Sequence, residues 1–236
     1  MLKNVRLRLQ QFDIYSVIGY YVLMKGKFVT FEGIEGCGKT SQAKLLVQYL
    51  EKKGYSVLMT REPGGTPVSE AVREILLSTD FTNMHPHTEV LLYLASRAQH
   101  VSEVIKPALE NGKIIICDRF SDSTFVYQCL VRGIDIRMVE TMNRFATDNI
   151  LPHITFVLDI EPEEGLRRAK ARNQKNMRGE DRMEREAMDF HQRVREGYLK
   201  WAAEYPDRIF VVRSDREKEE VHTEITGIIE RVLGIN

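Results

Sequence analysis

The segment Gly33-Ile34-Glu35-Gly36-Cys37-Gly38-Lys39-Thr40 decides the fold, because it matches the pattern G-x-x-x-x-G-K-[ST] at every fixed position. That pattern needs a buried strand before it and an amphipathic helix after it. The preceding Lys27–Glu32 is rich in β-branched and aromatic residues, and Lys39–Lys53 repeats apolar side chains at helical spacing until Gly54. Both flanks are present, so we interpret the segment as a phosphate-binding loop rather than a chance match in a glycine-rich turn.

The residue types of this loop explain its chemistry. Its glycines let backbone N–H groups curl around phosphate oxygens, and the helix N-terminus adds a positive dipole end. Lys39 can reach the β- and γ-phosphates of a nucleoside triphosphate, and the Thr40 hydroxyl can ligate Mg²⁺. The loop alone does not separate a kinase from a motor or a GTPase. The residues predicted to bind the nucleoside triphosphate, which the resemblance given below implies is ATP, are Gly33, Ile34, Glu35, Gly36, Cys37, Gly38, Lys39 and Thr40.

Strand and helix patterns alternate along the rest of the chain. Further strands are predicted at 56–60, 113–117, 154–158 and 208–212. Helices are predicted at 68–77, 88–109, 123–147 and 218–233, with two more around a charged segment at 172–183. Such alternation is typical of a parallel sheet with right-handed crossovers. We therefore expect an α/β, three-layer P-loop NTPase fold, with helices on both faces of the sheet.

Composition limits the classes of partner. Lys+Arg and Asp+Glu number 34 each, so the chain lacks the basic excess of a protein that coats nucleic acid, and we expect no nucleic-acid partner. The three cysteines have no metal-ligand spacing, and an odd number is a poor disulfide framework. We interpret them as free thiols in a reducing compartment, which predicts a cytoplasmic location.

The first 24 residues imitate a signal peptide, since basic residues precede an apolar run at 12–24. That run contains Asp13, lacks a small-residue cleavage site and is too short to span a bilayer. We expect residues 1–24 to be a non-functional extension, with Met24 as an alternative start, and residues 25–236 to form the domain. A docking segment or a membrane-associated helix are the alternatives, although no membrane partner is predicted.

A second strand end supplies an acid for the metal. The apolar run Ile114–Cys117 leads into Asp118 and then Arg119. A carboxylate there can hold the metal, and the guanidinium can bind phosphate oxygens in a bidentate manner. A helix N-cap is the alternative role for Asp118. Asp159 ends another apolar strand, but we favour a structural role there, so the predicted metal ligands are Thr40 and Asp118.

Several segments taken together resemble the thymidylate kinases, a branch of the nucleoside monophosphate kinases. The resemblance runs from about Lys25 to the C-terminus and implies phosphoryl transfer from ATP to dTMP with Mg²⁺. The motifs that carry it are Phe31-Glu32-Gly33, Arg61-Glu62-Pro63-Gly64-Gly65-Thr66, Arg97-Ala98-Gln99-His100, Asp118-Arg119-Phe120 and Arg178-Gly179-Glu180-Asp181-Arg182-Met183-Glu184.

The resemblance assigns three of the dTMP-binding residues near the first two strands. Glu62 follows the second predicted strand and supports the acceptor pocket, while Arg73 holds the acceptor's phosphate. Without the family, Arg73 would be interpreted as a solvated surface residue. Glu35 matches the acid that contacts the 3′-hydroxyl, a polar contact of the kind that sharpens nucleotide selection.

The remaining acceptor residues come from two helices. Tyr93 and Arg97 lie four residues apart and share a helix face, so the ring can stack on thymine and the guanidinium can bond a base carbonyl or the phosphate. The family more often has Phe at position 93. The resemblance further implies that Thr124 reads the base edge, that Tyr127 crowds the space of a 2′-hydroxyl, and that Gln128 lines the base and sugar. Arg119 is predicted to contact both substrates.

The segment from Gly165 to Arg195 holds ten Lys+Arg against five Asp+Glu. A solvated helix face is the default interpretation, but the family places a mobile lid over ATP here, at about 170–184. Gly36 stands where another branch carries a loop arginine, so the catalytic arginine should come from the lid. Five residues between Arg172 and Arg178 look like an insertion, which leaves open the identity of the arginine that reaches the phosphate; we favour Arg178, with Arg172 and Arg182 behind it.

The predicted reaction is an in-line transfer without a phospho-enzyme, in which Lys39, Asp118, Arg119 and a lid arginine are catalytic. One alternative is a kinase of the same fold that acts on dUMP, dCMP or a deoxynucleoside. Another is a catalytically silent nucleotide-binding module. The resemblance also implies a homodimer formed through helices.

Overall fold

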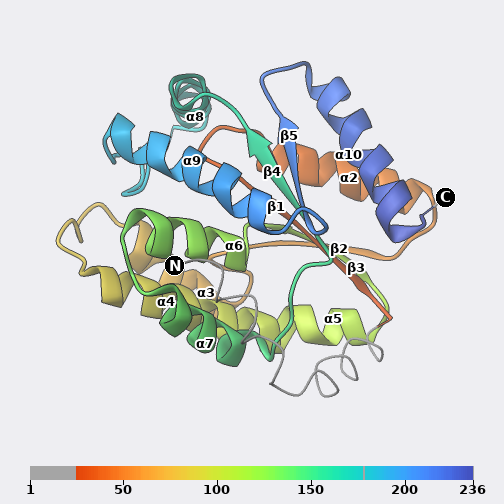
Figure 1. Ribbon diagram of the computed structural model, residues 1–236, viewed down its shortest axis with the longest axis horizontal. Coiled ribbons are helices and arrows are strands. Elements are labelled where there is room, and N and C mark those ends of the chain that lie inside the picture. The colour runs from red at the N-terminus through yellow and green to blue at the C-terminus, as the bar shows by residue number, and fades with distance from the viewer. Residues whose placement is uncertain (1–24, 178, 236) are drawn as a thin grey trace.

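The computed structural model of the chain describes residues 25–177 and 179–235. Its centre is a five-stranded sheet in the order β2-β3-β1-β4-β5 (Figure 1), and every neighbouring pair is parallel. The predicted parallel sheet is therefore confirmed, whereas the prediction for residues 1–24 lies outside the described residues. The strands are β1 Lys27–Glu32, β2 Val57–Arg61, β3 Ile114–Asp118, β4 Ile154–Asp159 and β5 Ile209–Arg213.

Helices cover both faces of this sheet, as the three-layer prediction requires. Helices α2 and α10 pack together on one face, and α9 and α5 contact the other. None of the described helices is long and apolar enough to cross a bilayer. The helices are α2 Lys39–Lys52, α3 Pro67–Leu77, α4 Pro86–His100, η1 Val101–Ile105, α5 Lys106–Glu110, α6 Ser121–Thr124, η2 Phe125–Val131, α7 Ile136–Thr147, α8 Pro162–Lys175, α9 Met188–Glu204 and α10 Lys218–Leu233, of which η1 and η2 are π-helical.

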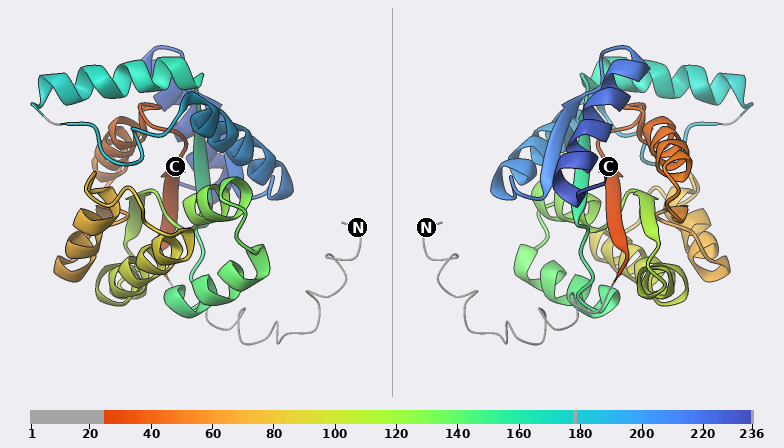
Figure 2. Two further views of the ribbon diagram at one scale, coloured as in Figure 1. Left: turned by 90° about the vertical axis from the view of Figure 1, so that its left-hand side faces the viewer. Right: turned by 90° about the vertical axis from the view of Figure 1, so that its right-hand side faces the viewer.

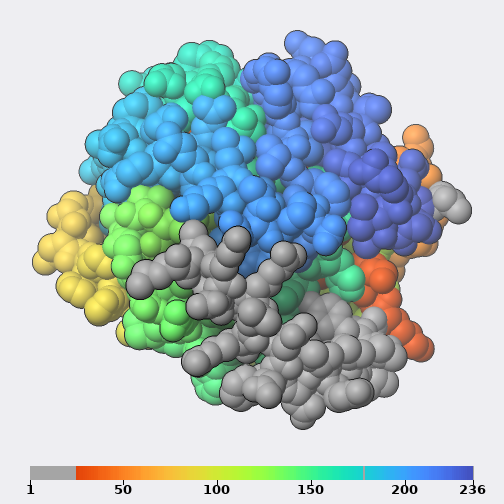
Figure 3. Space-filling view, viewed as in Figure 1, coloured from red at the N-terminus to blue at the C-terminus, as the bar shows by residue number. Residues whose placement is uncertain are grey.

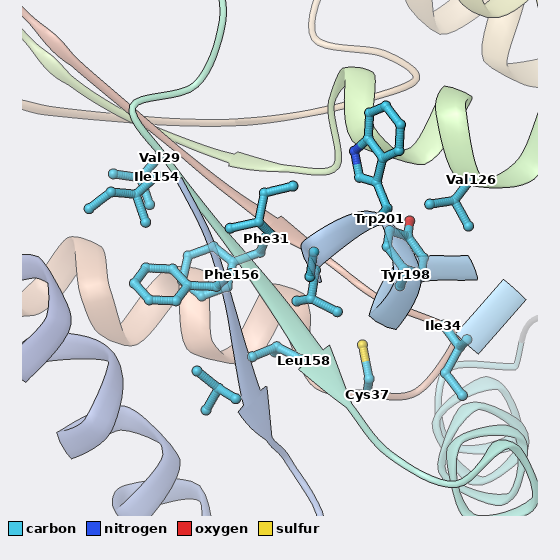
Figure 4. Close-up of a cluster of buried hydrophobic side chains, with 14 of the residues drawn as sticks. Val29, Phe31, Ile34, Cys37, Val126, Ile154, Phe156, Leu158, Tyr198 and Trp201 are labelled. Atoms are coloured by element: carbon cyan, nitrogen blue, oxygen red, sulfur yellow. The ribbon is translucent and has the colours of Figure 1, made fainter. Parts of the chain in front are cut away.

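The central strands are buried on both faces, which explains their continuous apolar runs. In β3, Ile115 packs against the cluster around η1 and α5, while its neighbour Ile116 faces the larger core. Phe31 and Phe156 of adjacent strands stack in that larger core with ring centroids 5.4 Å apart (Figure 4). Burial of each such ring stabilises the fold by roughly 2–3 kcal/mol.

The helix predicted at 123–147 is wrong as one continuous element. The chain instead forms α6 and η2, turns at 132–135, and begins α7 at Ile136. Gly133 provides the turn with φ of 79°, and Asp135 caps α7 by accepting hydrogen bonds from the N–H groups of Arg137 and Met138. The break leaves Thr124, Tyr127 and Gln128 on one short helical segment. The pattern at 88–109 is helical, as predicted, through α4, η1 and α5.

All strands run in one direction, so their carboxyl ends share one edge of the sheet. Figure 2 shows α8 projecting past the body beside this edge, with the following segment returning to α9. In the space-filling view, α8 and the C-terminal elements form the upper half of one face (Figure 3). The predicted lid includes the end of α8 and part of the connection to α9, although its division from the domain stays a prediction.

Candidate active site

The phosphate loop and its lysine form one unit after β1. Lys39 is 7% exposed, and its ammonium donates to the carbonyl oxygens of Ile34 at 2.7 Å and Gly33 at 3.2 Å. Gly38 caps α2 in the left-handed conformation, with φ of 98°. The side chain that is predicted to bind phosphate is therefore held inside the loop, at the N-terminus of α2.

Gly36 sits where the loop touches the first turn of α8. Its φ is 71°, and a Cβ atom there would lie 1.8 Å from the carbonyl oxygen of Gly165. A Cβ atom on Gly165 would in turn lie 2.5 Å from the carbonyl oxygen of Glu35. This contact of two backbones leaves no room for an arginine side chain at position 36, which agrees with the expectation that the catalytic arginine belongs to the lid.

The predicted metal ligands, Thr40 at the start of α2 and Asp118 at the end of β3, are in contact. The Thr40 hydroxyl donates to a carboxylate oxygen of Asp118. No group of three or more His, Cys, Asp or Glu residues gathers as a metal site within 25–177 and 179–235. One hydroxyl and one carboxylate are oxygen ligands of the kind that Mg²⁺ takes when phosphates supply the rest. The residues present therefore fit Mg²⁺.

Arg119 follows β3 with φ of 70°, a conformation uncommon for a residue other than glycine. One guanidinium nitrogen donates to Gly33 O at 2.8 Å and to the Tyr198 hydroxyl at 3.2 Å, and the other pairs with Glu35. Burial alone would raise the pKa of Glu35, but the charges of Arg119 and Lys39 lower it to about 2. Glu35 is therefore a carboxylate at neutral pH.

Beneath Arg119 lies Glu32, which sequence reasoning did not assign to the site although it stands in the quoted Phe31-Glu32-Gly33 motif. It is fully buried and accepts from Phe120 N at 2.8 Å, Ser123 Oγ at 2.7 Å and Tyr198 Oη at 2.8 Å. Burial outweighs the attraction of Arg119 and raises the pKa of Glu32 to about 7. Glu32 thus ties β1 to α6 and α9 below the cavity.

Arg97 is 2% exposed and has its guanidinium bonded on all sides. It donates to Glu62 Oε2 at 2.8 Å and to Thr124 Oγ1 at 3.0 Å. It also donates to Asn143 Oδ1 at 2.9 Å and to Phe120 O at 3.1 Å. The predicted neighbours Glu62, Arg97 and Thr124 are therefore brought together, and Asn143 is a fourth member that sequence reasoning missed.

Two aromatic residues and Arg73 line the cavity beyond Arg97. Burial, followed by the charge of Glu89, raises the pKa of Tyr93 to about 12, so its hydroxyl stays protonated. The Tyr127 ring lies under the Arg119 guanidinium, 5.5 Å from ring centroid to Cζ. Arg73 Nη1 donates to Pro63 O at 2.9 Å, which fixes its guanidinium just beyond the end of β2.

The three predicted lid arginines have different positions. Arg172 lines the cavity and pairs with Glu184 at 2.8 Å. Arg182 does not line it, because its guanidinium pairs with Glu89 at 2.6 Å. Arg178 lies outside the described residues.

One cavity of about 1010 Å³ joins these groups. Gly33 and Ile34 lie behind its wall, where their carbonyl oxygens accept from Lys39. The predicted residues that line it are Glu35, Gly36, Cys37, Gly38, Lys39, Thr40, Glu62, Arg73, Tyr93, Arg97, Asp118, Arg119, Thr124, Tyr127, Gln128 and Arg172.

The end of the cavity beside α8 and α10 has a lining that sequence reasoning missed, namely Arg168, Ser214, Arg216, Lys218 and Val221. Arg168 donates to Ser214 O at 3.0 Å, which joins α8 to the segment after β5. The signal was present, because residues that directly follow a parallel strand lie at the carboxyl edge, where α/β folds bind ligands.

A phosphate loop on a parallel sheet, a facing hydroxyl and carboxylate, and a cavity that runs on to a buried polar pocket define the class of P-loop kinases. The comparisons specify the family. Residues 31–225 match the model of the family described as thymidylate kinase. A thymidylate kinase of Thermoanaerobacter sp. (strain X514) is 49% identical over 210 residues, which cover 89% of this chain and 100% of that protein.

Two further relatives support the same family assignment. A thymidylate kinase of Maridesulfovibrio salexigens is 50% identical over 210 residues, covering 88% of this chain and 97% of that protein. The crystal structure of thymidylate kinase from Ehrlichia chaffeensis superposes with a TM-score of 0.69 at 34% identity, covering 86% of this chain and 98% of that chain. The chain belongs to the thymidylate kinase family.

Proposed function

We propose that the cavity holds ATP and dTMP end to end, with the phosphate loop around the triphosphate of ATP. The chain is an ATP-dependent dTMP kinase that produces dTDP and ADP. The observation that supports this division of the site is a continuous cavity that joins the phosphate loop to the pocket around Arg97. Its volume of about 1010 Å³ is at the upper end of the range for a pocket that holds one small ligand.

The donor half lies along α2, α8 and the segment after β5. Here the loop and Lys39 hold the triphosphate, and the wall formed by Arg168, Ser214 and Val221 receives the adenosine. Thr40 and Asp118 would hold Mg²⁺, which neutralises phosphate charge when it is bound.

The acceptor half lies between α4 and α6–η2. Tyr93 offers a flat apolar surface for the thymine ring, and the Thr124 hydroxyl lies beside it in a fixed orientation because Arg97 donates to it. Arg73 receives the acceptor phosphate near the end of β2. Tyr127 and Glu35 face the sugar, where a ring restricts space and a carboxylate accepts from a hydroxyl.

The geometry supports catalysis by position and charge rather than by a covalent intermediate. Lys39 and Arg119 converge on the loop, since both donate to Gly33 O. They would neutralise the transferring phosphoryl group together with a lid arginine, either Arg172 or Arg178. Closure of the lid excludes water, which strengthens each of these contacts.

The test is a coupled assay of ADP release with ATP and Mg²⁺ that compares dTMP, dUMP, dCMP, dGMP and thymidine. We expect dTMP to exceed the others by about tenfold or more, because a methyl group in a shaped pocket and a satisfied polar contact each discriminate on that scale. Equal rates with dUMP would overturn the assignment of the base pocket but keep the donor half.

We also propose that the enzyme is a homodimer, as the resemblance to its family implies, and that it works in the cytoplasm. All three cysteines are buried free thiols, which supports a reducing compartment. Light scattering on the eluted protein measures the oligomeric state, and a monomer at micromolar concentration would contradict the proposed dimer.

A further inference from the structure

One buried carboxylate lies between the acceptor pocket and the lid. Glu89, on the first turn of α4, is 1% exposed. It accepts a hydrogen bond from Gln128 Nε2 at 2.9 Å and two from Arg132, at 3.1 and 3.3 Å. It also pairs with Arg182 Nη2 at 2.6 Å. Three segments far apart in the sequence thus meet at this side chain.

On the lid side, Arg182 is held at both ends. Its backbone N–H donates to Leu77 O at 3.1 Å, and its Nε donates to Leu76 O at 2.9 Å, so it is fixed to the last turn of α3. Its side chain is only 10% exposed. The flanking Asp181 and Met183 line the cavity, so the position of Arg182 sets where this part of the lid covers the acceptor half.

On the pocket side, Gln128 is 2% exposed and lines the cavity, as does Tyr93, which stands one turn after Glu89 on α4. Arg132, just beyond η2, extends the same network by pairing with Glu186 at 2.7 Å. The carboxylate therefore holds the segment that forms the acceptor wall and, through two arginines, both ends of residues 182–186.

Electrostatics keep Glu89 charged in this position. Burial raises the pKa of a carboxyl, but the hydrogen bond from Gln128 and the charges of Arg132 and Arg182 together hold the pKa of Glu89 below its ordinary value. Removal of the charge would leave Arg182, whose side chain is 10% exposed, without its carboxylate partner and would leave Arg132 with Glu186 alone, which is costly in a site largely shielded from water.

We propose that Glu89 is a positioning residue that couples the acceptor pocket to the lid. Because one carboxylate holds both Gln128 and Arg182, binding of dTMP and ordering of the lid segment 181–186 become one thermodynamic event. Coupling of this kind is reciprocal, so a fixed lid segment also strengthens dTMP binding. The inference rests on the proposed acceptor site and gives Arg182 a role away from the reacting phosphate.

The alternative is that these ion pairs only stabilise the fold, and the chain offers a matched control. Asp122 is also 1% exposed and accepts from Arg208 at 2.8 Å and from the Trp201 indole at 2.7 Å. Neither Asp122 nor Arg208 lines the cavity. Arg208→Met therefore breaks a comparable buried pair without touching the pocket or the lid.

The experiment measures hydrogen exchange of amides 181–186 in the full chain, with and without saturating dTMP and without ATP. In the unmodified chain we expect dTMP to slow this exchange by about tenfold, within the usual range of coupling between sites. Glu89→Gln and Arg182→Met should each lose most of that protection and raise the KM for dTMP about tenfold, with kcat changed less than threefold. The double variant should be no worse than the more affected single variant.

Arg208→Met should lower the melting temperature and keep the protection by dTMP. Full protection in Glu89→Gln and Arg182→Met, with only a lower melting temperature, would overturn the coupling. Arg182→Met leaves Glu89 with Gln128 and Arg132, so it decides the question even when Glu89→Gln does not fold. Calorimetry separates the two failures, since absent dTMP binding to the unmodified chain sinks the acceptor site, whereas binding without protection sinks only the coupling.

Discussion

The two edges of the same sheet are built from opposite materials. At the carboxyl edge, the buried side chains include ionisable groups, as Glu32 and Lys39 show, and Arg119 has a backbone conformation rare outside glycine. At the amino edge, around the starts of β1, β3 and β4, Phe28, Leu109 and Ile150 form an apolar cluster. Burial of charge costs free energy, whereas burial of apolar surface supplies it. The apolar edge therefore sustains a site that would not be stable by itself.

The sharpest way to separate the two edges is to remove the loop ammonium. Lys39→Met should lower kcat by at least about a hundredfold, the scale for loss of a preorganised charge, because no other cation bonds the loop carbonyls of both Gly33 and Ile34 among the described residues. Steady-state assays with ATP and dTMP measure the loss. Lys52→Met, at the exposed far end of the same helix, is the control. A loss below threefold in Lys39→Met would contradict the assignment.

The second substitution tests whether the phosphate loop can be displaced from α8 without loss of stability or activity. Gly36→Ala places a Cβ atom against the α8 backbone, so we expect loss of about 2–4 kcal/mol of stability and about tenfold or more in kcat. Gly38→Ala is the matched control, because Gly38 also has a positive φ but a Cβ there meets nothing within 4 Å. Urea unfolding compares them. Equal destabilisation of the two variants would show that φ strain, and not the contact with α8, dominates.

A change at the amino edge should do the reverse. Leu109 is 1% exposed and its carbonyl oxygen accepts from Gly26 N at 3.0 Å, next to the start of β1. Leu109→Ala should cost about 2–4 kcal/mol of unfolding free energy through the cavity that it leaves. The turnover per folded molecule should stay within about twofold of the original. A tenfold fall in kcat with this variant would mean that the edges are not separable.

The sequence predicted which residues meet at the carboxyl edge of the sheet, but it did not predict all the side-chain pairings around them. The phosphate loop, Asp118 and Arg119 follow apolar strands, and a parallel sheet brings all strand ends to one edge, so their meeting was predictable. The break after Val131 was missed because the helical pattern of 123–147 outweighed the signal of Gly133. The sequence pattern also could not predict the ion pair of Arg182 with Glu89. These residues are 93 positions apart (182 − 89), and local periodicity does not show how the segments that carry them pack together.

The smallest expected effect also distinguishes the two edges of the sheet, because a titrating group at each edge should change the stability with pH in the opposite sense. At the amino edge, His153 Nδ1 accepts from Phe28 N at 3.0 Å, and burial, followed by the charge of Lys27, lowers the pKa of His153 to about 4. The unfolded imidazole, with its ordinary pKa of about 6.5, binds more protons between these values, so this contribution to stability is lost as the pH falls from about 6.5 to 4.

Glu32 behaves in the opposite sense, because its folded pKa of about 7 lies above the ordinary value of 4.5. Its contribution is complete below pH 4.5 and is lost as the pH rises to 7, so the two slopes oppose each other between pH 4.5 and 6.5. In Glu32→Gln the effect of His153 remains, so the stability should fall as the pH is lowered. In His153→Asn the effect of Glu32 remains, so the stability should fall as the pH is raised toward neutral. Each slope is at most about 1.4 kcal/mol per pH unit, and smaller for the partly exposed imidazole. Urea midpoints between pH 4.5 and 6.5 measure both slopes. Slopes of the same sign in the two variants would refute the proposed opposition between the two edges of the sheet.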